Sequence, residues 1–221
     1  NLKSYYVEGL LEFQKGNPLL ALEYLNKIIE YKKNNPQVLS LISLCYFNLK
    51  NFLEAEKFIS KAIINDPNEK GFYINKGNIL KAQKKYLEAE KIYNQAIGLF
   101  GKSSVLLYSL GSIFSLQNLF LDSISFYNEA ITLDKTNKYA FNNKGIALKE
   151  LGKYSEAIDN FKIAISIDNN FPQANFNLGY TQLLLGNNSE GWTKYEYRTH
   201  ANNDKKIELD NLNIKKWNGN S

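Results

Sequence analysis

One column of hydrogen-bonding side chains recurs at intervals of 34 positions along the chain. Its members are Asn75, Ser109, Asn143 and Asn177. A carboxamide offers both a donor and an acceptor, so it can pair with the peptide group of an extended chain whatever that chain's side chains are. Such a ladder would hold a polypeptide by its backbone. Val7 and Leu41 take the two earlier places, and an Asn-rich chain can also produce such a column by chance.

Residues suited to covalent or metal chemistry are few and lie far apart. Nucleophilic catalysis needs a base beside the nucleophile, and the single histidine, His200, is distant in sequence from the single cysteine, Cys45. One Cys and one His do not make a zinc site, and no acidic loop suits calcium. Glu54 and Glu56 are two positions apart, so on a helix they face different directions. We therefore predict no catalytic residue, no metal and no cofactor.

The column belongs to a 34-residue repeat that runs six times, without a gap, from Leu2 to about residue 200. Two further columns hold only small residues, and a third holds large ones. Two helices approach each other most closely where the residues between them are small. The small columns therefore predict the crossing point of two helices in each repeat, and the large column fills the remaining space. The small columns are Gly9, Ser43, Gly77, Gly111, Gly145, Gly179 and Ala21, Ala55, Ala89, Ser123, Ala157, Gly191; the large one is Leu25, Ile59, Tyr93, Tyr127, Phe161, Tyr195.

This pattern resembles the tetratricopeptide repeat, a helix-turn-helix unit of 34 residues. The fifth repeat carries the resemblance most fully, with Phe141, Gly145, Leu148, Gly152, Tyr154, Ala157, Phe161 and Ala164. The resemblance implies an all-α fold, a right-handed α-solenoid of six repeats within residues 2–200. We expect the repeats at about 2–35, 36–69, 70–103, 104–137, 138–171 and 172–200, followed by a polar connector at 201–221.

The first helix of each repeat has a side that packing leaves open. In repeat 3, helical periodicity places Gly71, Asn75, Asn78 and Ala82 there. In tetratricopeptide arrays the first helices line the concave side of the superhelix, so the resemblance implies a groove lined by amides and apolar groups. The amide column is similar to the asparagine ladder of O-linked N-acetylglucosamine transferases, which grips protein substrates. We predict that a peptide binds Asn75, Asn78, Ser109, Tyr139, Asn143, Asn177 and Tyr180.

The apolar positions on this side have an alternative interpretation, because the neighbouring repeat could bury them. Leu41 and Leu44 are the clearest cases. A second class of repeat clamps the carboxylate tails of chaperones with Lys, Asn and Arg. It is disfavoured because Tyr6, Leu10 and Leu41 stand at the corresponding places in the first two repeats.

The end of the sequence resembles bacterial proteins that join such repeats to a glycosyltransferase-like domain. The shared residues are Gly191, Trp192, Tyr195, Glu196 and Arg198, followed by a W-x-G element at Trp217. The resemblance implies that this chain is the substrate-binding arm of a larger transferase. From the residues alone, Trp192 and Tyr195 could equally cap the end of the solenoid.

Composition narrows the partners and the compartment. The net charge of +5 permits an anionic partner, but the Lys residues are interspersed with Glu and Asp, which disfavours nucleic acid. Residues 103–121 carry no charge, yet Gly111 and Phe120 keep the repeat register, which predicts helix, turn and helix rather than a membrane span. The lone cysteine gives no sign of an oxidising compartment, and the lack of a methionine and of a charged-then-apolar leader predicts a fragment or processed product rather than a secreted precursor. We expect a cytoplasmic protein. The alternative function is a structural scaffold that self-associates through repeat 4 or its ends.

Overall fold

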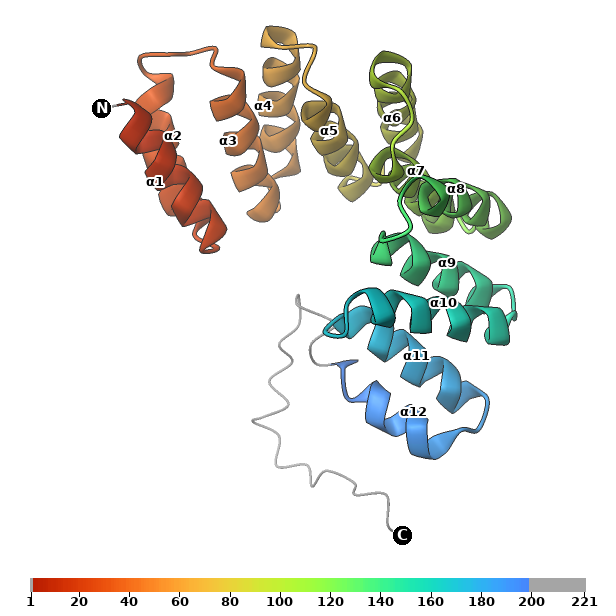
Figure 1. Cartoon of the computed structure of the whole chain (residues 1–221). Coiled ribbons are helices and arrows are strands. Elements are labelled where there is room, and N and C mark those ends of the chain that lie inside the picture. Colours follow the sequence, from red (N-terminus) through yellow and green to blue (C-terminus); the bar gives the residue numbers. More distant parts are fainter. Residues whose placement is uncertain (1, 199–221) are drawn as a thin grey trace, which may run out of the picture. The chain divides into compact units, whose positions relative to one another are not determined.

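The computed structural model describes residues 2–198, and within them it contains twelve α-helices and no strand (Figure 1). The predicted connector at 201–221, with Trp217, lies outside the described residues, as does His200. The first helix of each successive pair begins 34 residues after the last, at positions 2, 36, 70, 104, 138 and 172. The helices are α1 (Leu2–Gln14), α2 (Pro18–Ile29), α3 (Pro36–Asn48), α4 (Phe52–Asn65), α5 (Lys70–Ala82), α6 (Tyr86–Phe100), α7 (Ser104–Leu116), α8 (Phe120–Leu133), α9 (Lys138–Glu150), α10 (Tyr154–Ile167), α11 (Pro172–Leu184) and α12 (Asn188–Tyr195).

Local sequence accounts for where the helices begin. Asn35 and Asn137 accept a hydrogen bond from the backbone N–H three residues on, which caps α3 and α9. Pro36 and Pro172 occupy the first turn, where a helix has no use for the N–H that proline lacks. These side chains satisfy or remove donors that would otherwise be unpaired at a helix start.

The turn inside each helix pair has one residue with a left-handed backbone conformation. These residues are again 34 positions apart: Gly16, Lys50, Lys84, Asn118, Gly152 and Gly186, with φ between 59° and 84°. After α3, the N–H of Lys50 donates to Phe47 O and the N–H of Asn51 donates to Tyr46 O, which is the Schellman arrangement. The helix is therefore ended by backbone geometry even where the residue is not glycine.

The paired helices cross at the small residues, as the columns predicted. A Cβ added to Gly77 on α5 would lie 2.2 Å from Cε1 of Tyr93 on α6. On α9 and α10, a Cβ at Gly145 would lie 2.6 Å from Cε1 of Phe161. In α3 and α4 the contact is polar instead, because the hydroxyl of Ser43 donates to Ala55 O at 2.7 Å. At Gly77 and Gly145, a large aromatic ring thus packs directly on the backbone of the facing helix.

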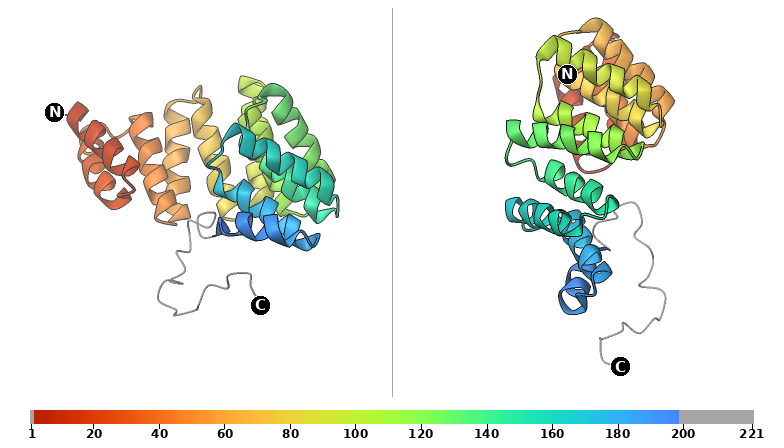
Figure 2. Two further views of the ribbon diagram at one scale, coloured as in Figure 1. Left: turned by 60° about the horizontal axis from the view of Figure 1, so that its bottom comes forward. Right: turned by 90° about the vertical axis from the view of Figure 1, so that its right-hand side faces the viewer.

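The chain divides into two compact units, Asn1–Gln117 and Asn118–Ser221, whose helices Figure 2 shows from two further directions. In the first unit each helix packs on the next, and the odd-numbered helices also contact one another: α1 with α3, α3 with α5 and α5 with α7. In the second unit α8 to α12 pack in sequence, and α9 contacts α11. Within each unit, the odd-numbered helices therefore form a continuous face.

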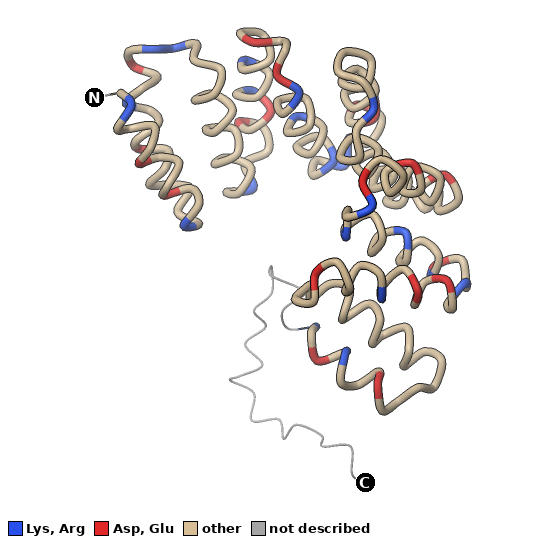
Figure 3. The backbone as a smooth tube through the Cα atoms, viewed as in Figure 1, with Lys and Arg blue, Asp and Glu red and all other residues tan. Residues whose placement is uncertain are grey.

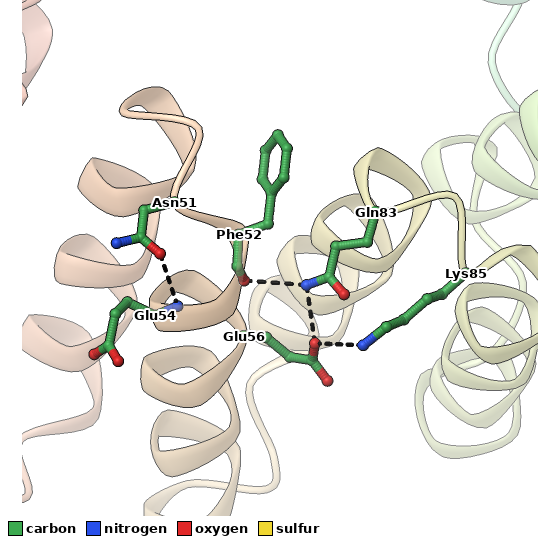
Figure 4. A network of polar contacts seen from close by, with 6 residues as sticks. All are labelled: Asn51, Phe52, Glu54, Glu56, Gln83 and Lys85. Atoms are coloured by element: carbon green, nitrogen blue, oxygen red, sulfur yellow. Dashed lines mark hydrogen bonds and ion pairs between the residues drawn. The ribbon is translucent and has the colours of Figure 1, made fainter.

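A polar network joins successive helix pairs of the first unit (Figure 4). Nε2 of Gln83 donates to Phe52 O at 3.1 Å and to Oε2 of Glu56 at 2.9 Å, and Nζ of Lys85 lies 3.1 Å from the same oxygen. Burial raises the pKa of Glu56, but the hydrogen bonds from Gln83 and Lys85 outweigh it, so the net pKa is lowered. The start of α4 is thereby tied to the turn between α5 and α6.

The uncharged stretch at 103–121 folds as predicted from the repeat register. It forms α7, a turn and the beginning of α8. Across residues 2–198, no helix combines the length and the apolarity needed to cross a bilayer.

Candidate functional site

The odd-numbered helices of the first unit enclose a cavity of about 350 Å³. Its walls come from α3, α5 and α7, and two of the predicted peptide-binding residues, Asn75 and Asn78, line it. Apolar side chains complete the walls, namely Leu44, Phe47, Ile79, Ala82 and Leu116. The cavity thus combines two amide groups with a largely apolar lining.

Lys81 also lines this cavity, and sequence reasoning did not select it. Its Nζ donates to the hydroxyl of Ser112 on α7 at 3.3 Å. Burial lowers the pKa of the Lys81 ammonium. The sequence signal was available, because Lys81 follows Asn78 by three positions and so shares its helix face.

Asn78 is held by a buried tyrosine. The hydroxyl of Tyr93 donates to Oδ1 of Asn78 at 2.8 Å, and Ser109 lies close enough to the same hydroxyl to lower its pKa, against the larger effect of burial. Burial raises the pKa of Tyr93, so the phenol stays protonated and can donate. Ser109 itself is only 3% exposed. Ser109 is therefore buried in this structure, and its direct contact with a peptide stays a prediction that this burial disfavours.

In the second unit, three asparagines form a hydrogen-bonded chain. Nδ2 of Asn177 donates to Oδ1 of Asn142 at 2.9 Å, and Nδ2 of Asn142 donates to Oδ1 of Asn143 at 3.0 Å. Asn142 is buried, whereas Asn143 and Asn177 are half-buried. The structure therefore brings two predicted site residues together through a third that the sequence analysis missed.

The same connection occurs in the first unit. Nδ2 of Asn75 makes a long hydrogen bond of 3.5 Å to the hydroxyl of Ser40, which is 35 positions earlier, as Asn142 is from Asn177. In both units the acceptor, Ser40 or Asn142, therefore stands directly before the column residue of the previous repeat, Leu41 or Asn143. A polar residue 35 positions before a column Asn was the sequence signal that could have identified Asn142.

The predicted tyrosines both lie in the second unit and are partly exposed. Tyr139 is 52% exposed, and its ring meets Phe171 edge-on, with 5.3 Å between centroids. Tyr180 is 38% exposed and stacks on Phe176, and Nζ of Lys149 lies 5.0 Å from the centroid of its ring. Both rings therefore combine packing against a neighbouring ring with partial exposure.

The apolar positions on this side divide between the two interpretations. Leu41 is buried and Leu44 is half-buried, as the alternative allowed. Val105 and Leu116 in the first unit are 50% and 52% exposed, and Leu184 in the second is 53% exposed. The face of the odd-numbered helices thus keeps apolar surface in both units, even though neighbouring repeats cover part of it.

A second cavity, of about 500 Å³, lies in the second unit between α10, α11 and α12. Gln182 lines it, donates Nε2 to Oε2 of Glu190 at 2.8 Å, and leaves its own buried Oε1 without a hydrogen bond. None of the predicted site residues lines this cavity.

Comparison with protein families gives four matches, all to tetratricopeptide repeats. Those described as "Tetratricopeptide repeat" match residues 6–70, 71–102 and 126–159, and one described as "TPR repeat" matches residues 147–186. Together these matches cover most of the chain. No curated protein sequence matches it significantly.

Several solved structures share the fold at low sequence identity. PilW, a type IV pilus biogenesis factor, superposes with a TM-score of 0.77 at 15% identity, covering 96% of this chain and 97% of its own. PilF of Pseudomonas aeruginosa superposes with a TM-score of 0.73 at 15% identity, covering 90% of each chain. YrrB, described as a TPR protein with an unusual peptide-binding site, gives 0.53 at 19% identity, covering 86% of this chain and 98% of its own.

Proposed function

Since this chain belongs to the tetratricopeptide-repeat proteins, a family of protein-interaction modules, we propose that it binds an extended polypeptide segment on the face of its odd-numbered helices. In the first unit the binding groups are the amides of Asn75 and Asn78, and in the second unit they are the amides of Asn143 and Asn177, aided by Tyr139 and Tyr180. YrrB supports the general mode, since its description names a peptide-binding site. The buried free thiol of Cys45 supports the further proposal of a cytoplasmic location.

The observation that carries the proposal is the hydrogen bond from Asn177 to Asn142. A carboxamide has two N–H groups and an oxygen with two lone pairs. Asn177 uses one N–H to fix its amide plane, and no donor among residues 2–198 reaches its Oδ1. That oxygen is therefore held in place and can accept a peptide N–H.

The ladder can be tested with a fluorescein-labelled mixture of nine-residue peptides of random uncharged sequence, by fluorescence anisotropy. Asn177→Ala should weaken binding roughly two- to tenfold, the worth of one neutral hydrogen bond. Asn94→Ala is the matched control, because Asn94 is exposed on α6, away from this face. The same mixture with N-methylated backbones should bind poorly, since it cannot donate to Oδ1. Equal affinity of both mixtures would exclude recognition of the backbone.

The transferase arm is a narrower form of this proposal, in which the bound segment is the acceptor of a sugar. Its support is the Gly191, Trp192, Tyr195 and Arg198 pattern. In the structure Trp192 is 43% exposed and meets Tyr195 edge-on, with ring centroids 5.6 Å apart, which also suits the capping interpretation. Reading the codons that follow Ser221 in the gene tests it, because a stop codon there removes the narrower form and leaves peptide binding intact.

Self-association is the second candidate, and a column of exposed leucines favours it. Leu19, Leu53 and Leu87, at the starts of α2, α4 and α6, are 66%, 75% and 70% exposed. Repeated apolar surface of this kind often marks a protein contact. Light scattering over a concentration series separates the candidates, since the mean mass of a self-associating scaffold rises with concentration. In a Leu53→Ser, Leu87→Ser double variant this rise in mass should disappear. A constant monomer mass excludes the scaffold.

A further inference from the structure

Lys81 places a positive charge in a cavity whose wall helices carry no acidic residue. The cavity walls come from α3, α5 and α7. Neither α3 nor α7 carries any Asp, Glu, Lys or Arg, and the only charged residues on α5 are lysines (Figure 3). The ammonium of Lys81 therefore faces helices that supply no carboxylate.

No carboxylate on the neighbouring even-numbered helices forms an ion pair with Lys81, the half-buried Glu90 on α6 included. Glu56 on α4 pairs with Lys85 and Gln83, and Glu88 on α6 is exposed. Nζ of Lys81 makes one hydrogen bond, to the neutral hydroxyl of Ser112. An ammonium has three N–H donors, so its bonding capacity is largely unused.

A half-buried cation without a counter-charge is costly, and burial does lower the pKa of Lys81. A ligand that brings a carboxylate next to Nζ would replace that cost with a charge-assisted hydrogen bond. The cavity volume of about 350 Å³ is within the range of roughly 300–1,000 Å³ usual for ligand sites. Charge complementarity therefore selects an anionic group for this cavity.

We propose that the cavity between α3, α5 and α7 binds the side-chain carboxylate of an acidic residue in the bound peptide, with Lys81 as its counter-ion. This rests on the proposed function, because the amides of Asn75 and Asn78 line the same cavity and hold the peptide backbone. Lys81 lies one helical turn beyond Asn78. If the amides hold the backbone of the peptide, the part of the peptide that reaches Lys81 is a side chain. Leu44, Phe47 and Leu116 then pack on its methylene groups.

The test compares three labelled peptide mixtures on the full chain by fluorescence anisotropy. Each has nine residues, an acetylated N-terminus and an amidated C-terminus, with the central residue fixed as Glu, Gln or Lys and the others random and uncharged. The Glu mixture should bind roughly tenfold or more tighter than the Gln mixture, with the Lys mixture weakest. Lys81→Gln should abolish this preference, and Lys91→Gln, which changes an exposed lysine on α6, should not.

The outcomes separate this inference from the proposed function. Equal binding of all three mixtures overturns the carboxylate site and leaves peptide binding standing. Absence of any binding overturns both. A fourth mixture, equal to the Gln mixture but with a free C-terminal carboxylate, is measured alongside; if it alone gains affinity from Lys81, the cavity belongs to a chain end and the side-chain assignment is overturned. The comparison of Glu with Gln on the unmodified protein stands even if the Lys81 variant folds poorly.

Discussion

The hydroxyl of Tyr93 lies 2.8 Å from Oδ1 of Asn78, so a fully buried core residue positions an amide of the candidate site. Tyr93→Phe keeps the ring and removes the hydrogen bond. We expect the free energy of unfolding in urea to fall by about 0.5–1.5 kcal/mol, and peptide affinity to fall with it because Asn78 is no longer oriented. Unchanged peptide affinity in a destabilised variant would show that Asn78 has no part in binding.

The close approach of Gly77 to Tyr93 predicts that replacement of glycine by alanine changes stability in opposite directions at Gly77 and at Gly98. Gly77→Ala places a methyl group 2.2 Å from the Tyr93 ring and should destabilise the fold by about 1–3 kcal/mol. Gly98→Ala on α6 meets no atom within 4 Å and should stabilise it by about 0.5–1 kcal/mol, as Ala does in a helix. Urea unfolding of both variants tests this, and similar effects in the two would contradict the packing explanation.

The left-handed turn residues predict a second pair of opposite effects. Lys84 has a φ of 62° and is exposed, so Lys84→Gly should relieve strain and raise the unfolding free energy by about 0.5–1 kcal/mol. Gly152 has a φ of 75°, and Gly152→Ala should lower the free energy of unfolding by about 1 kcal/mol. Thermal midpoints measured side by side check the signs; a stabilising Gly152→Ala would be incompatible with this turn.

Glu56 should make stability depend on pH. Its folded pKa is lowered, so its contribution is present above the unfolded value, near 4.5, and disappears as the pH falls through the lower folded pKa. Glu56→Gln should therefore lower the free energy of unfolding by about 0.5–1 kcal/mol at pH 7 and by less at pH 3. Urea unfolding at both pH values measures it. Glu88→Gln, at an exposed carboxylate on α6, is the control and should cost little at either pH.

Cys45 should be inert to thiol reagents while the protein is folded. Burial raises its pKa to about 12, and its side chain is fully buried, so no thiolate is available at neutral pH. Labelling with a chromogenic disulfide should occur only as urea unfolds the chain. With a raised folded pKa, the contribution of this thiol to stability is intact below pH 9 and declines as the pH rises towards 12. Rapid labelling without urea would show that α3 opens readily.

The fold was predictable because it depends on the periodic spacing of few residue types. The Gly77 and Tyr93 columns identified the helix crossings, and the 34-residue register resolved the uncharged stretch at 103–121 into helix, turn and helix. The left-handed backbone at Lys50 and Lys84 was not predicted, since lysine carries no preference for it and only the surrounding helices impose it.

The candidate site was less predictable because helical periodicity gives a direction and not an exposure. Ser109 has the right direction, yet Tyr93 and the neighbouring helices enclose it. Lys81 and Asn142 acquire their roles from residues on other helices, Ser112 and Asn177. Such pairings depend on which helices become neighbours, and one repeat considered alone does not contain them.

The separation of 35 positions in the bonds from Asn75 to Ser40 and from Asn177 to Asn142 makes the order of the modules matter. An artificial array built by copying residues 70–103 end to end would preserve every helix crossing. However, the residue 35 positions before each copied Asn75 would then be Ile74, whereas in the natural chain it is Ser40. Those amides would lose their anchors, so the copies would stack correctly and still present a different surface.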